Sequence, residues 1–533
     1  MFALLFFLCG LAFFYMNLLP YKTDTDIPLY TLLGSFDRLI QIIAVIGILG
    51  YYLLNALPAR TNTARLNWVL IIFWLGAFVF SIPFAVSNAL LGTNEVEPIL
   101  IFFKDNQVDD IKTIGLDGFT GPLLFWSSIV AVILWASYHL IRTKKHAVNI
   151  LAVTGVILLV SSPFVQYLAR LVLPNAAHQN FDFVQRLTPP VFEAKPSQQK
   201  NLIIVYLESI ERSYGEMPEF DTFYQPVRDL AARGLEFTDV QQVTGTNYTI
   251  AGIVSTHCGV PLLPNGLKSV FFQSNMSAQM ESFMPSTRCL GDVLADDGYT
   301  LSYMNGASLD KFSKRAFLKE HGYTRFFDYR SLPEDVKKGR MNVWGLNDAL
   351  LFESVTKEYD TLKADGAPFA LSMLTLSTHG PDAFLDQNCP PAPGIDSQLP
   401  RAIECTSKLV SGLVDHIAAQ GDTDNTVVVV LSDHLALFNS LRTQLESIGP
   451  DRRNLFIMLG ASETPSKNPR AMTLFDLYPS ILEGLGYKLK DGRANFGVSA
   501  NSTNQNLIEE LGQATINKTF KANQKLAGYL WRP

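Results

Sequence analysis

The sequence predicts two structural units, an N-terminal α-helical membrane domain and a C-terminal α/β domain with a mainly parallel central sheet. The membrane domain is predicted because long uncharged apolar runs are confined to the first third of the 533 residues. The α/β domain is predicted from three short apolar runs at 202–207, 369–376 and 426–431, which are typical of strands buried on both faces. Helical stretches separate these runs, as in a parallel sheet covered by helices.

The N-terminal domain, residues 1–170, is expected to contain five transmembrane helices. Its apolar runs cover residues 2–19, 39–59, 66–94, 118–139 and 147–169. Each run is close to or longer than the roughly 18 to 20 residues that cross a bilayer as a helix. The first run lacks a charged segment before it and a small-residue cleavage site after it, which favours a membrane span over a signal peptide.

Loop charges predict the orientation of these helices, because short loops rich in Lys and Arg stay in the cytoplasm. Arg60 and Arg65 lie between the second and third runs, and Arg142, Lys144 and Lys145 lie between the fourth and fifth. A mainly acidic loop joins the third run to the fourth. With both basic loops inside, an odd number of spans places the chain after the fifth run outside the cytoplasm.

The rest of the chain is predicted to form a linker, residues 171–200, and an extracytoplasmic domain, residues 201–533. The linker contains four prolines and no sustained periodicity, which indicates an irregular segment along the outer membrane face or a solvated connection. The domain is long enough to bury a large core. The net charge of −6 says little about partners, and no nucleic-acid partner is expected.

Four of the five cysteines lie in the extracytoplasmic domain, where an oxidising compartment permits two disulfides. The pairing of Cys258 with Cys289 and of Cys389 with Cys405 is favoured because it closes the shorter loops. Buried free thiols are the alternative.

Acidic and imidazole side chains follow the three predicted strands. Glu208 comes directly after the first strand, His379 follows the run at 369–376, and Asp433 and His434 follow the third. The carboxyl ends of parallel strands share one edge of a sheet, so these side chains are expected to converge. Buried charges need partners, and a divalent cation would be one. The structural alternatives are helix capping, turn formation and strand termination.

A further oxygen ligand is expected from Thr249, in the stretch 244–266, where a small-polar loop turns into a run with helical apolar spacing. A helix N-terminus presents unpaired backbone N–H groups and the positive end of the helix dipole, which suit an anion. As a plain N-cap, Thr249 would have no chemical role. With two carboxylates and an imidazole, its oxygen completes a mixed donor set suited to manganese, zinc or magnesium.

This donor set predicts phosphoryl transfer. A metal bound to the Thr249 oxygen lowers the pKa of the hydroxyl and screens its approach to an anionic phosphodiester. His379 then protonates the leaving alkoxide, or holds the phosphate or hydroxyls of the substrate. The attack yields a phospho-threonine, which an acceptor hydroxyl resolves.

Several segments together resemble the alkaline phosphatase and sulfatase superfamily. They are NLIIVYLES, the loop that contains Thr249, the LPNG and SVFF segments after it, LTLSTHGP and LSDH. The nearest resemblance is to the membrane-anchored phosphoglycerol transferases, namely the lipoteichoic acid synthases and the phosphoglycerol transferase I enzymes that decorate osmoregulated periplasmic glucans. TGTNYTIAGIV and SDHLAL look most like the latter. The resemblance covers about residues 201–487 and implies an alkaline-phosphatase-like fold.

The resemblance also implies a role for each candidate residue. The implied metal ligands are Glu208, Thr249, Asp433 and His434, the implied nucleophile is Thr249, and the implied substrate contact is His379. Counting back from the Leu-Pro pair that follows the predicted helix favours Thr249 as the nucleophile. Thr246 is the alternative, because the two residues before Thr249 depart from the synthase pattern.

Contacts to the substrate head group are implied at Phe312, Lys314 and Arg315. In the lipoteichoic acid synthases a Trp and an Arg that contact glycerol phosphate lie upstream of a Gly-Tyr pair, which resembles the pair at 322–323. By spacing, these positions hold Phe312 and Lys314 here. A lysine cannot make the two-pronged phosphate contact of an arginine, so the neighbouring Arg315 is a substitute for it.

The expected function is metal-dependent transfer of phosphoglycerol from phosphatidylglycerol to hydroxyls of a periplasmic glucan or a similar glycan, with release of diacylglycerol. The resemblance implies a bacterial inner-membrane protein with a periplasmic catalytic domain, and Mn²⁺ as the metal, with Mg²⁺ or Zn²⁺ as alternatives. The alternative functions are polymerisation of the lipoteichoic acid synthase kind, phosphoethanolamine transfer, and a membrane-anchored sensor with a degenerate enzyme fold. A sulfatase would need Cys or Ser in a C/S-x-P-x-R context, which TIAGI lacks.

Overall fold

The computed structural model of the protein describes residues 182–263, 282–380, 382–394, 397–437, 439–461, 464–521 and 523–532. The chain divides into two compact units, Met1–Ala169 and Arg170–Pro533, and every described residue belongs to the second. The five predicted membrane spans therefore lie outside the described residues. None of the helices in the described part of the chain has the length and apolar character needed to cross a membrane.

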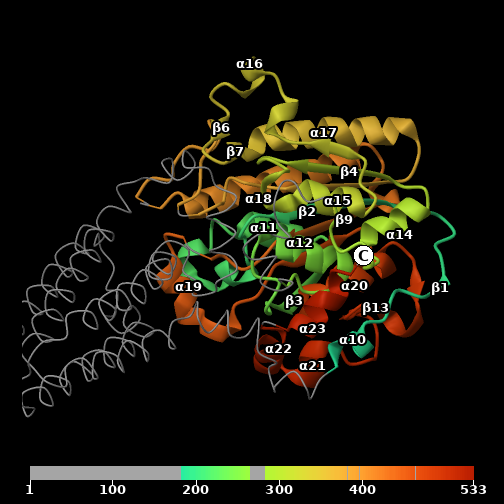
Figure 1. Cartoon of the computed structure of the whole chain (residues 1–533). Coiled ribbons are helices and arrows are strands. Elements are labelled where there is room, and N and C mark those ends of the chain that lie inside the picture. The colour runs from blue at the N-terminus through green and yellow to red at the C-terminus, as the bar shows by residue number, and fades with distance from the viewer. Residues whose placement is uncertain are drawn as a thin grey trace, which may run out of the picture. The chain divides into compact units, whose positions relative to one another are not determined.

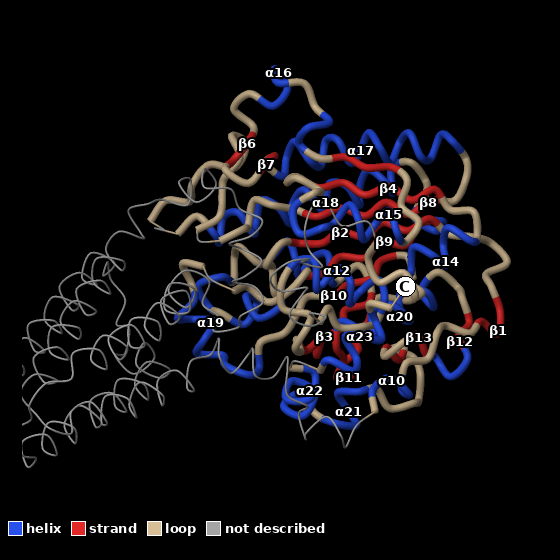
Figure 2. The backbone as a smooth tube through the Cα atoms, in the orientation of Figure 1, coloured by secondary structure: helices blue, strands red, loops and turns tan. Residues whose placement is uncertain are grey.

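An eight-stranded sheet forms the centre of the described unit (Figure 2). In sheet order its strands are β11 (Ser466–Thr473), β3 (Leu235–Gln241), β10 (Phe456–Leu459), β9 (Thr426–Ser432), β2 (Asn201–Leu207), β8 (Phe369–Leu374), β4 (Thr300–Asn305) and β5 (Arg325–Phe327). β10 runs antiparallel to both of its neighbours, and all other neighbouring strands are parallel. The predicted α/β domain with a mainly parallel sheet is confirmed.

The three strands predicted from apolar runs lie side by side at the centre of this sheet. Every residue of β2, β8 and β9 is buried, which explains why these strands lack polar alternation. β8 ends at Leu374 rather than at Leu376. The chain leaves the sheet there because the backbone N–H of Leu376 donates to Asp348 Oδ1, 2.7 Å away, instead of to a strand.

Helices cover both faces of the sheet (Figure 1), and each face has its own apolar core. Along β2 the side chains alternate between these cores, with Ile204 and Tyr206 on one face and Ile203 and Val205 on the other. The helices of the first face include α12 (Thr249–Cys258), α14 (Leu290–Asp296) and α20 (Leu477–Gly484), and those of the second include α11 (Gln225–Ala231), α17 (Asp348–Asp365) and α18 (Leu399–Ala419).

The remaining elements are short. The helices are α10 (Phe183–Arg186), α15 (Lys314–Glu320), α16 (Glu334–Lys337), α19 (Arg442–Ile448), α21 (Leu507–Leu511), α22 (Gln513–Phe520) and α23 (Gln524–Leu530). Three small antiparallel pairs join β1 (Phe192–Ala194) to β12 (Lys488–Leu489), β6 (Met341–Asn342) to β7 (Gly345–Leu346), and β13 (Arg493–Ala494) to β14 (Gly497–Val498). Single 3₁₀ turns cover Arg212–Glu216, Pro218–Phe220, Lys311–Ser313, Tyr329–Ser331, Thr423–Asn425, Gly449–Asp451, Leu474–Asp476 and Lys490–Gly492.

The described part of the predicted linker, residues 182–200, packs on the α/β domain. Phe183 is buried, with edge-to-face contacts to the rings of Phe496 and Phe520. β1 pairs with β12 of the domain. These contacts hold the polypeptide against the domain before its first central strand begins.

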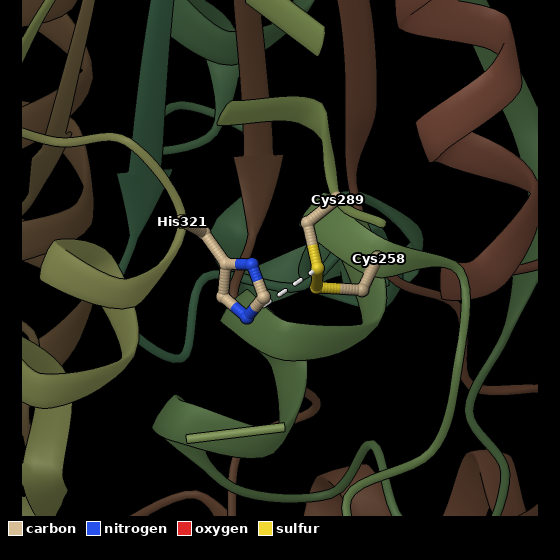
Figure 3. Close-up of side chains that lie close together, drawn as sticks. All are labelled: Cys258, Cys289 and His321. Carbon is tan, nitrogen blue, oxygen red and sulfur yellow. Dashed lines mark hydrogen bonds between the residues drawn. A yellow bond between two sulfur atoms is a disulfide. The ribbon is translucent and has the colours of Figure 1, made fainter. Parts of the chain in front are cut away.

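Two disulfides join Cys258 to Cys289 and Cys389 to Cys405, which confirms the favoured pairing. The first, drawn in Figure 3, ties the end of α12 to the start of α14. His321 lies beside it, with Nε2 3.7 Å from Cys289 Sγ. Both sulfurs are committed to the disulfide, so this cluster offers no thiolate ligands for a metal.

Candidate metal centre and active site

The sheet topology brings three predicted ligands together at the carboxyl edge. β2 and β9 are neighbours, and their last residues, Leu207 and Ser432, are paired. Glu208 therefore lies beside Asp433 and His434. One ligand atom from each of these three residues lies within 4.8 Å of the others, and all three side chains are buried.

The Asp433 carboxylate has one satisfied oxygen and one orphaned oxygen. Oδ1 accepts hydrogen bonds from the backbone N–H groups of Ser209 at 3.0 Å and His434 at 2.9 Å. Oδ2 is buried and has no hydrogen-bond partner among the described residues. A buried carboxylate oxygen without a partner is costly, so this atom fits a cation.

The orientation of His434 also fits a cation. Its Nδ1 lies 2.8 Å from the carbonyl oxygen of Leu435, which can only accept, so Nδ1 carries the proton. In the neutral ring Nε2 then presents a lone pair, 3.2 Å from Asp433 Oδ2 and 3.8 Å from Glu208 Oε1. Lone pairs at these distances repel one another unless a proton or a metal ion lies among them. Burial acts to lower the pKa of His434, but without a metal the negative charges of Asp433 and Glu208 raise it, so a protonated ring supplies the positive charge that a metal would otherwise supply. Two carboxylates and one imidazole are donors for a divalent ion such as Mn²⁺ or Zn²⁺.

The electrostatics of the two carboxyl groups differ. Burial and the negative charge of Glu208 raise the pKa of Asp433 to about 7. Burial also acts to raise the pKa of Glu208, but the charges of His379 and His434 outweigh it and lower the pKa. Glu208 is therefore held ionised, whereas Asp433 beside it resists ionisation. A bound cation would stabilise the ionised form of both carboxyl groups.

Thr249 is the first residue of α12, and its side chain is half-buried at the same edge. Its Oγ1 lies 3.5 Å from Glu208 Oε2 and 3.5 Å from His434 Nε2. Tyr248 precedes it as the N-cap residue. The hydroxyl therefore meets the ligand cluster at the N-terminus of a helix, where backbone N–H groups also face the site.

Gly252 explains how α12 can pack so close to the backbone of Asp433 at the end of β9. A Cβ atom at this position would lie 1.8 Å from the backbone oxygen of Asp433. Only a glycine leaves room for the helix backbone to pack against the end of β9. The position of Thr249 beside the ligands therefore depends on a residue one turn further along the helix.

Thr246, the alternative nucleophile, is fully buried in the loop before α12. Its hydroxyl donates to the carbonyl oxygen of Val243 at 2.8 Å and accepts from the backbone N–H of Val243 at 3.2 Å. These bonds close the loop, and of the two threonine hydroxyls it is that of Thr249 that lies beside the candidate ligands.

His379 lies after β8, half-buried, and its charge acts on Glu208. Its ring lies 4.5 Å, between centroids, from the ring of Trp344. Lys311 Nζ lies 5.9 Å from the centre of the same indole. Trp344 and Lys311 were not identified from the sequence. A signal for Trp344 was available, since an aromatic residue in the turn-like stretch Asn-Val-Trp-Gly is unusual.

Hydroxyl groups that sequence reasoning also missed hold Glu208 in place. Its backbone N–H donates to Thr375 Oγ1 at 2.9 Å, and its backbone oxygen accepts from the Thr378 hydroxyl. Ser209 Oγ donates to Glu208 Oε1 at 2.8 Å from a residue with a positive φ of 55°. Thr375 and Thr378 both belong to the segment that links β8 to His379, so the segment that carries one candidate residue also holds the backbone of another, Glu208.

The three predicted head-group residues lie in and after a turn with two consecutive left-handed residues, Phe312 and Ser313. Lys314 is almost fully buried, and its Nζ donates to the Lys311 carbonyl at 3.0 Å. Arg315 Nε donates to Asp310 Oδ1 at 2.8 Å. Lys311 of the same turn faces Trp344 beside His379, so the turn borders the candidate site through Lys311.

Asn305 adds a polar group at the same edge of the sheet. It ends β4 and is paired with Leu374 at the end of β8. Its Nδ2 is buried and lacks a hydrogen-bond partner among the residues that the structure describes.

Comparison with known proteins places this geometry in a family. The chain matches the family described as Sulfatase over residues 200–487. It is 32% identical over 333 residues to phosphoglycerol transferase I of Citrobacter koseri, which covers 61% of this chain and 42% of that protein. It is 33% identical over 304 residues to phosphoglycerol transferase I of Escherichia coli O127:H6, covering 56% of this chain and 39% of that protein. The chain thus spans about two-fifths of the length of these curated relatives.

Among solved structures, the lipoteichoic acid synthase LtaP from Listeria monocytogenes is 15% identical, with a TM-score of 0.46 and coverage of 68% of this chain and 96% of that chain. An alkaline phosphatase superfamily protein from Vibrio parahaemolyticus is 18% identical, with a TM-score of 0.45 and coverage of 60% and 73%. The family match is the decisive comparison, since it covers more than half of the 533 residues. The protein belongs to the Sulfatase family.

Proposed function

We propose that the protein is a phosphoglycerol transferase that moves phosphoglycerol from phosphatidylglycerol to a hydroxyl of a periplasmic glucan and releases diacylglycerol. The observation that carries this proposal is the Thr249 hydroxyl at the head of α12, 3.5 Å from both Glu208 and His434. The similarity to two proteins named phosphoglycerol transferase I supports the choice of substrate.

Glu208, Asp433, His434 and Thr249 would hold the metal, for which Mn²⁺ is proposed ahead of Mg²⁺ and Zn²⁺. The orphaned Asp433 Oδ2 and the lone pair of His434 Nε2 support this assignment. When bound, the ion supplies a positive charge that favours the alkoxide of Thr249 and neutralises a phosphodiester.

In the proposed first step, Thr249 Oγ1 attacks the phosphorus and the bond to the diacylglycerol oxygen breaks. His379 gives a proton to that departing oxygen. The N-terminus of α12 stabilises the charge on the non-bridging oxygens. In the second step an acceptor hydroxyl gives its proton to His379 and attacks the phosphoglycerol on Thr249, and the threonine oxygen leaves as the alkoxide with which the cycle began.

The head group of the donor would lie between His379 and the surrounding polar groups. Trp344 packs on His379 and Lys311 faces the indole of Trp344. Both are proposed contacts in addition to Phe312, Lys314 and Arg315. The mixture of cations and neutral donors suits a small, polar, anionic head group.

The proposed location is the bacterial inner membrane, with the α/β domain in the periplasm. The five apolar runs of the sequence support it, because a domain held beside the outer leaflet meets lipid donors at high effective concentration. A soluble phosphodiester would gain nothing from such an anchor.

The test is to incubate the purified protein with phosphatidylglycerol vesicles and Mn²⁺ and to measure diacylglycerol, with phosphatidylethanolamine vesicles in parallel. Release from phosphatidylglycerol that is stopped by a chelator is expected. Equal or faster release from phosphatidylethanolamine would instead indicate a phosphoethanolamine transferase. A second assay measures which acceptor is used. The expected result is that a periplasmic glucan gains phosphoglycerol and that no glycerol phosphate polymer forms.

A further inference from the structure

Exposed large hydrophobic side chains are concentrated in one short segment of the described chain. Val336, Met341 and Val343 are 39%, 38% and 50% exposed. The only other strongly exposed large hydrophobic residue among those described is Val191, at 51%. We call residues 336–344 the apolar rim. Scattered single apolar residues are common on protein surfaces, whereas apolar residues that gather in one place are typical of interaction sites.

The apolar rim is held in a defined conformation. Its tip is the two-residue turn Val343–Trp344, between the paired residues Asn342 and Gly345 of β6 and β7. Asn342 Oδ1 accepts hydrogen bonds from the backbone N–H groups of Trp344 at 2.8 Å and Gly345 at 3.3 Å. Two-residue hairpin turns normally carry Gly, Asn or Asp. Valine and tryptophan contribute nothing to turn formation, so their presence at this tip needs another reason.

The hairpin is fastened directly beside the candidate active site. The indole of Trp344 packs on His379, with ring centroids 4.5 Å apart. The backbone N–H of Leu346 donates to Gly306 at 3.1 Å, and a Cβ at Gly345 would lie 2.2 Å from the Gly306 oxygen. One residue of the turn therefore contacts a proposed substrate-binding histidine, while its neighbour Val343 faces solvent.

We propose that the apolar rim is a membrane-contact surface, in which Met341 and Val343 enter the boundary between head groups and acyl chains of a phospholipid bilayer. This contact brings the lipid head group to His379 through Trp344. The inference rests on the proposed function, because it assigns the route by which a lipid donor enters the same site.

The chemistry of the rim favours a lipid surface over a glycan or a protein. Its exposed large side chains, Val336, Met341 and Val343, are not aromatic. Sugars are recognised by aromatic faces, and the indole of Trp344 is already packed on His379. Tryptophan beside aliphatic residues is typical of the membrane–water interface. Lys338 within the rim is exposed, and so are Glu334 and Asp335 just before it, so the charge of this segment is mixed and the argument rests on its apolar side chains. The apolar runs of the sequence keep the chain at a bilayer.

A matched control exists on the same unit. Val191 is as exposed as Val343, and its backbone is also fixed, since its carbonyl accepts from the N–H of Lys490 at 2.8 Å. It directly precedes β1, which lies across the unit from β6, β7 and α16 in Figures 1 and 2. If the rim enters the bilayer, Val191 should remain in water.

The first experiment measures insertion without requiring catalysis. The full-length protein carries Cys9→Ser, which leaves only the four disulfide-bonded cysteines, and then Val343→Cys or Val191→Cys. Each cysteine is labelled with an environment-sensitive fluorophore, and the protein is reconstituted into phosphatidylglycerol-containing vesicles with or without brominated acyl chains. Strong quenching at position 343 and little at 191 is expected. Equal quenching at the two positions, or none at 343, overturns the proposal.

The second experiment separates lipid access from chemistry. The double variant M341D/V343D is compared with V191D on bilayer phosphatidylglycerol and on short-chain phosphatidylglycerol that is monomeric in solution. The loss of diacylglycerol release should be about tenfold greater on the bilayer substrate for the double variant only. Equal losses on the two substrates, or a changed KM for the glycan alone, would contradict membrane contact. If the unsubstituted protein releases no diacylglycerol from either lipid, the proposed function is wrong. The quenching experiment still tests whether the rim contacts the membrane.

Discussion

Asp433 is the residue on which the proposed metal centre depends most, because its two oxygens have different surroundings. Oδ1 is satisfied by two backbone N–H groups, and Oδ2 is orphaned beside the lone pair of His434 Nε2. An isosteric change at this side chain can therefore test the metal without disturbing the backbone contacts.

Asp433→Asn should weaken metal binding by more than about tenfold while the metal-free protein remains folded. The amide oxygen can still accept from Ser209 and His434, and the amide nitrogen can donate to His434 Nε2 in place of the metal. Metal content and thermal unfolding with chelator present are the two readouts. Retention of stoichiometric metal by the variant would show that Asp433 is not a ligand.

A second residue, His257, is buried and neutral. Its Nδ1 and Nε2 lie 2.9 Å from the hydroxyls of Tyr206 and Tyr323, and burial lowers its pKa to about 4. In the unfolded chain His257 takes up a proton near pH 6.5, whereas in the folded protein it does so only near pH 4. The contribution of neutral His257 to the free energy of unfolding is therefore present above pH 6.5 and is lost as the pH falls toward 4.

The free energy of unfolding of the metal-free protein should fall by up to about 3 kcal/mol over this pH range because of His257 alone. Urea unfolding at pH 7 and at pH 4.5, in chelator, measures the loss. The pH dependence should be smaller in His257→Gln, which cannot take up the proton. An identical dependence in the two proteins would mean that other groups control acid unfolding.

At the scale of elements, the packing of α12 against the end of β9 decides the geometry of the site. Gly252→Ala would force a methyl group against the Asp433 backbone and should destabilise the protein by about 2 kcal/mol or more. Gly412→Ala is the control, since Gly412 lies within α18 with nothing within 4 Å of an added Cβ. It should stabilise by about 0.5 to 1 kcal/mol. Similar unfolding free energies for the two variants would disprove the close approach.

The elements that could be predicted from the sequence are those with a local signal. β2, β8 and β9 are continuous apolar runs, and the parallel-sheet rule then places the residues that follow them at one edge. Trp344 could not be placed, because β6 and β7 have two residues each and no periodicity. The turn at Phe312 could not be predicted from the sequence either, since neither Phe nor Ser typically adopts the left-handed conformation found at 312 and 313.

At the scale of the whole molecule, the proposal requires the α/β domain and the lipid donor to share one side of the membrane. Reporter fusions after Arg65 and Lys145 should report the cytoplasm, and a fusion after Lys200 should report the periplasm. A cytoplasmic signal after Lys200 would imply an even number of spans and would remove the lipid-facing mechanism.

The central claim is that phosphoglycerol passes through Thr249. The most direct measurement is peptide mass spectrometry of the protein after reaction with phosphatidylglycerol and Mn²⁺ in the absence of an acceptor. The account predicts a phosphoglycerol adduct on the peptide that contains Thr249, its loss in Thr249→Ala with the fold retained, and its discharge when glucan is added. Diacylglycerol release at the normal rate by Thr249→Ala, or an adduct on Thr246 instead, would contradict it.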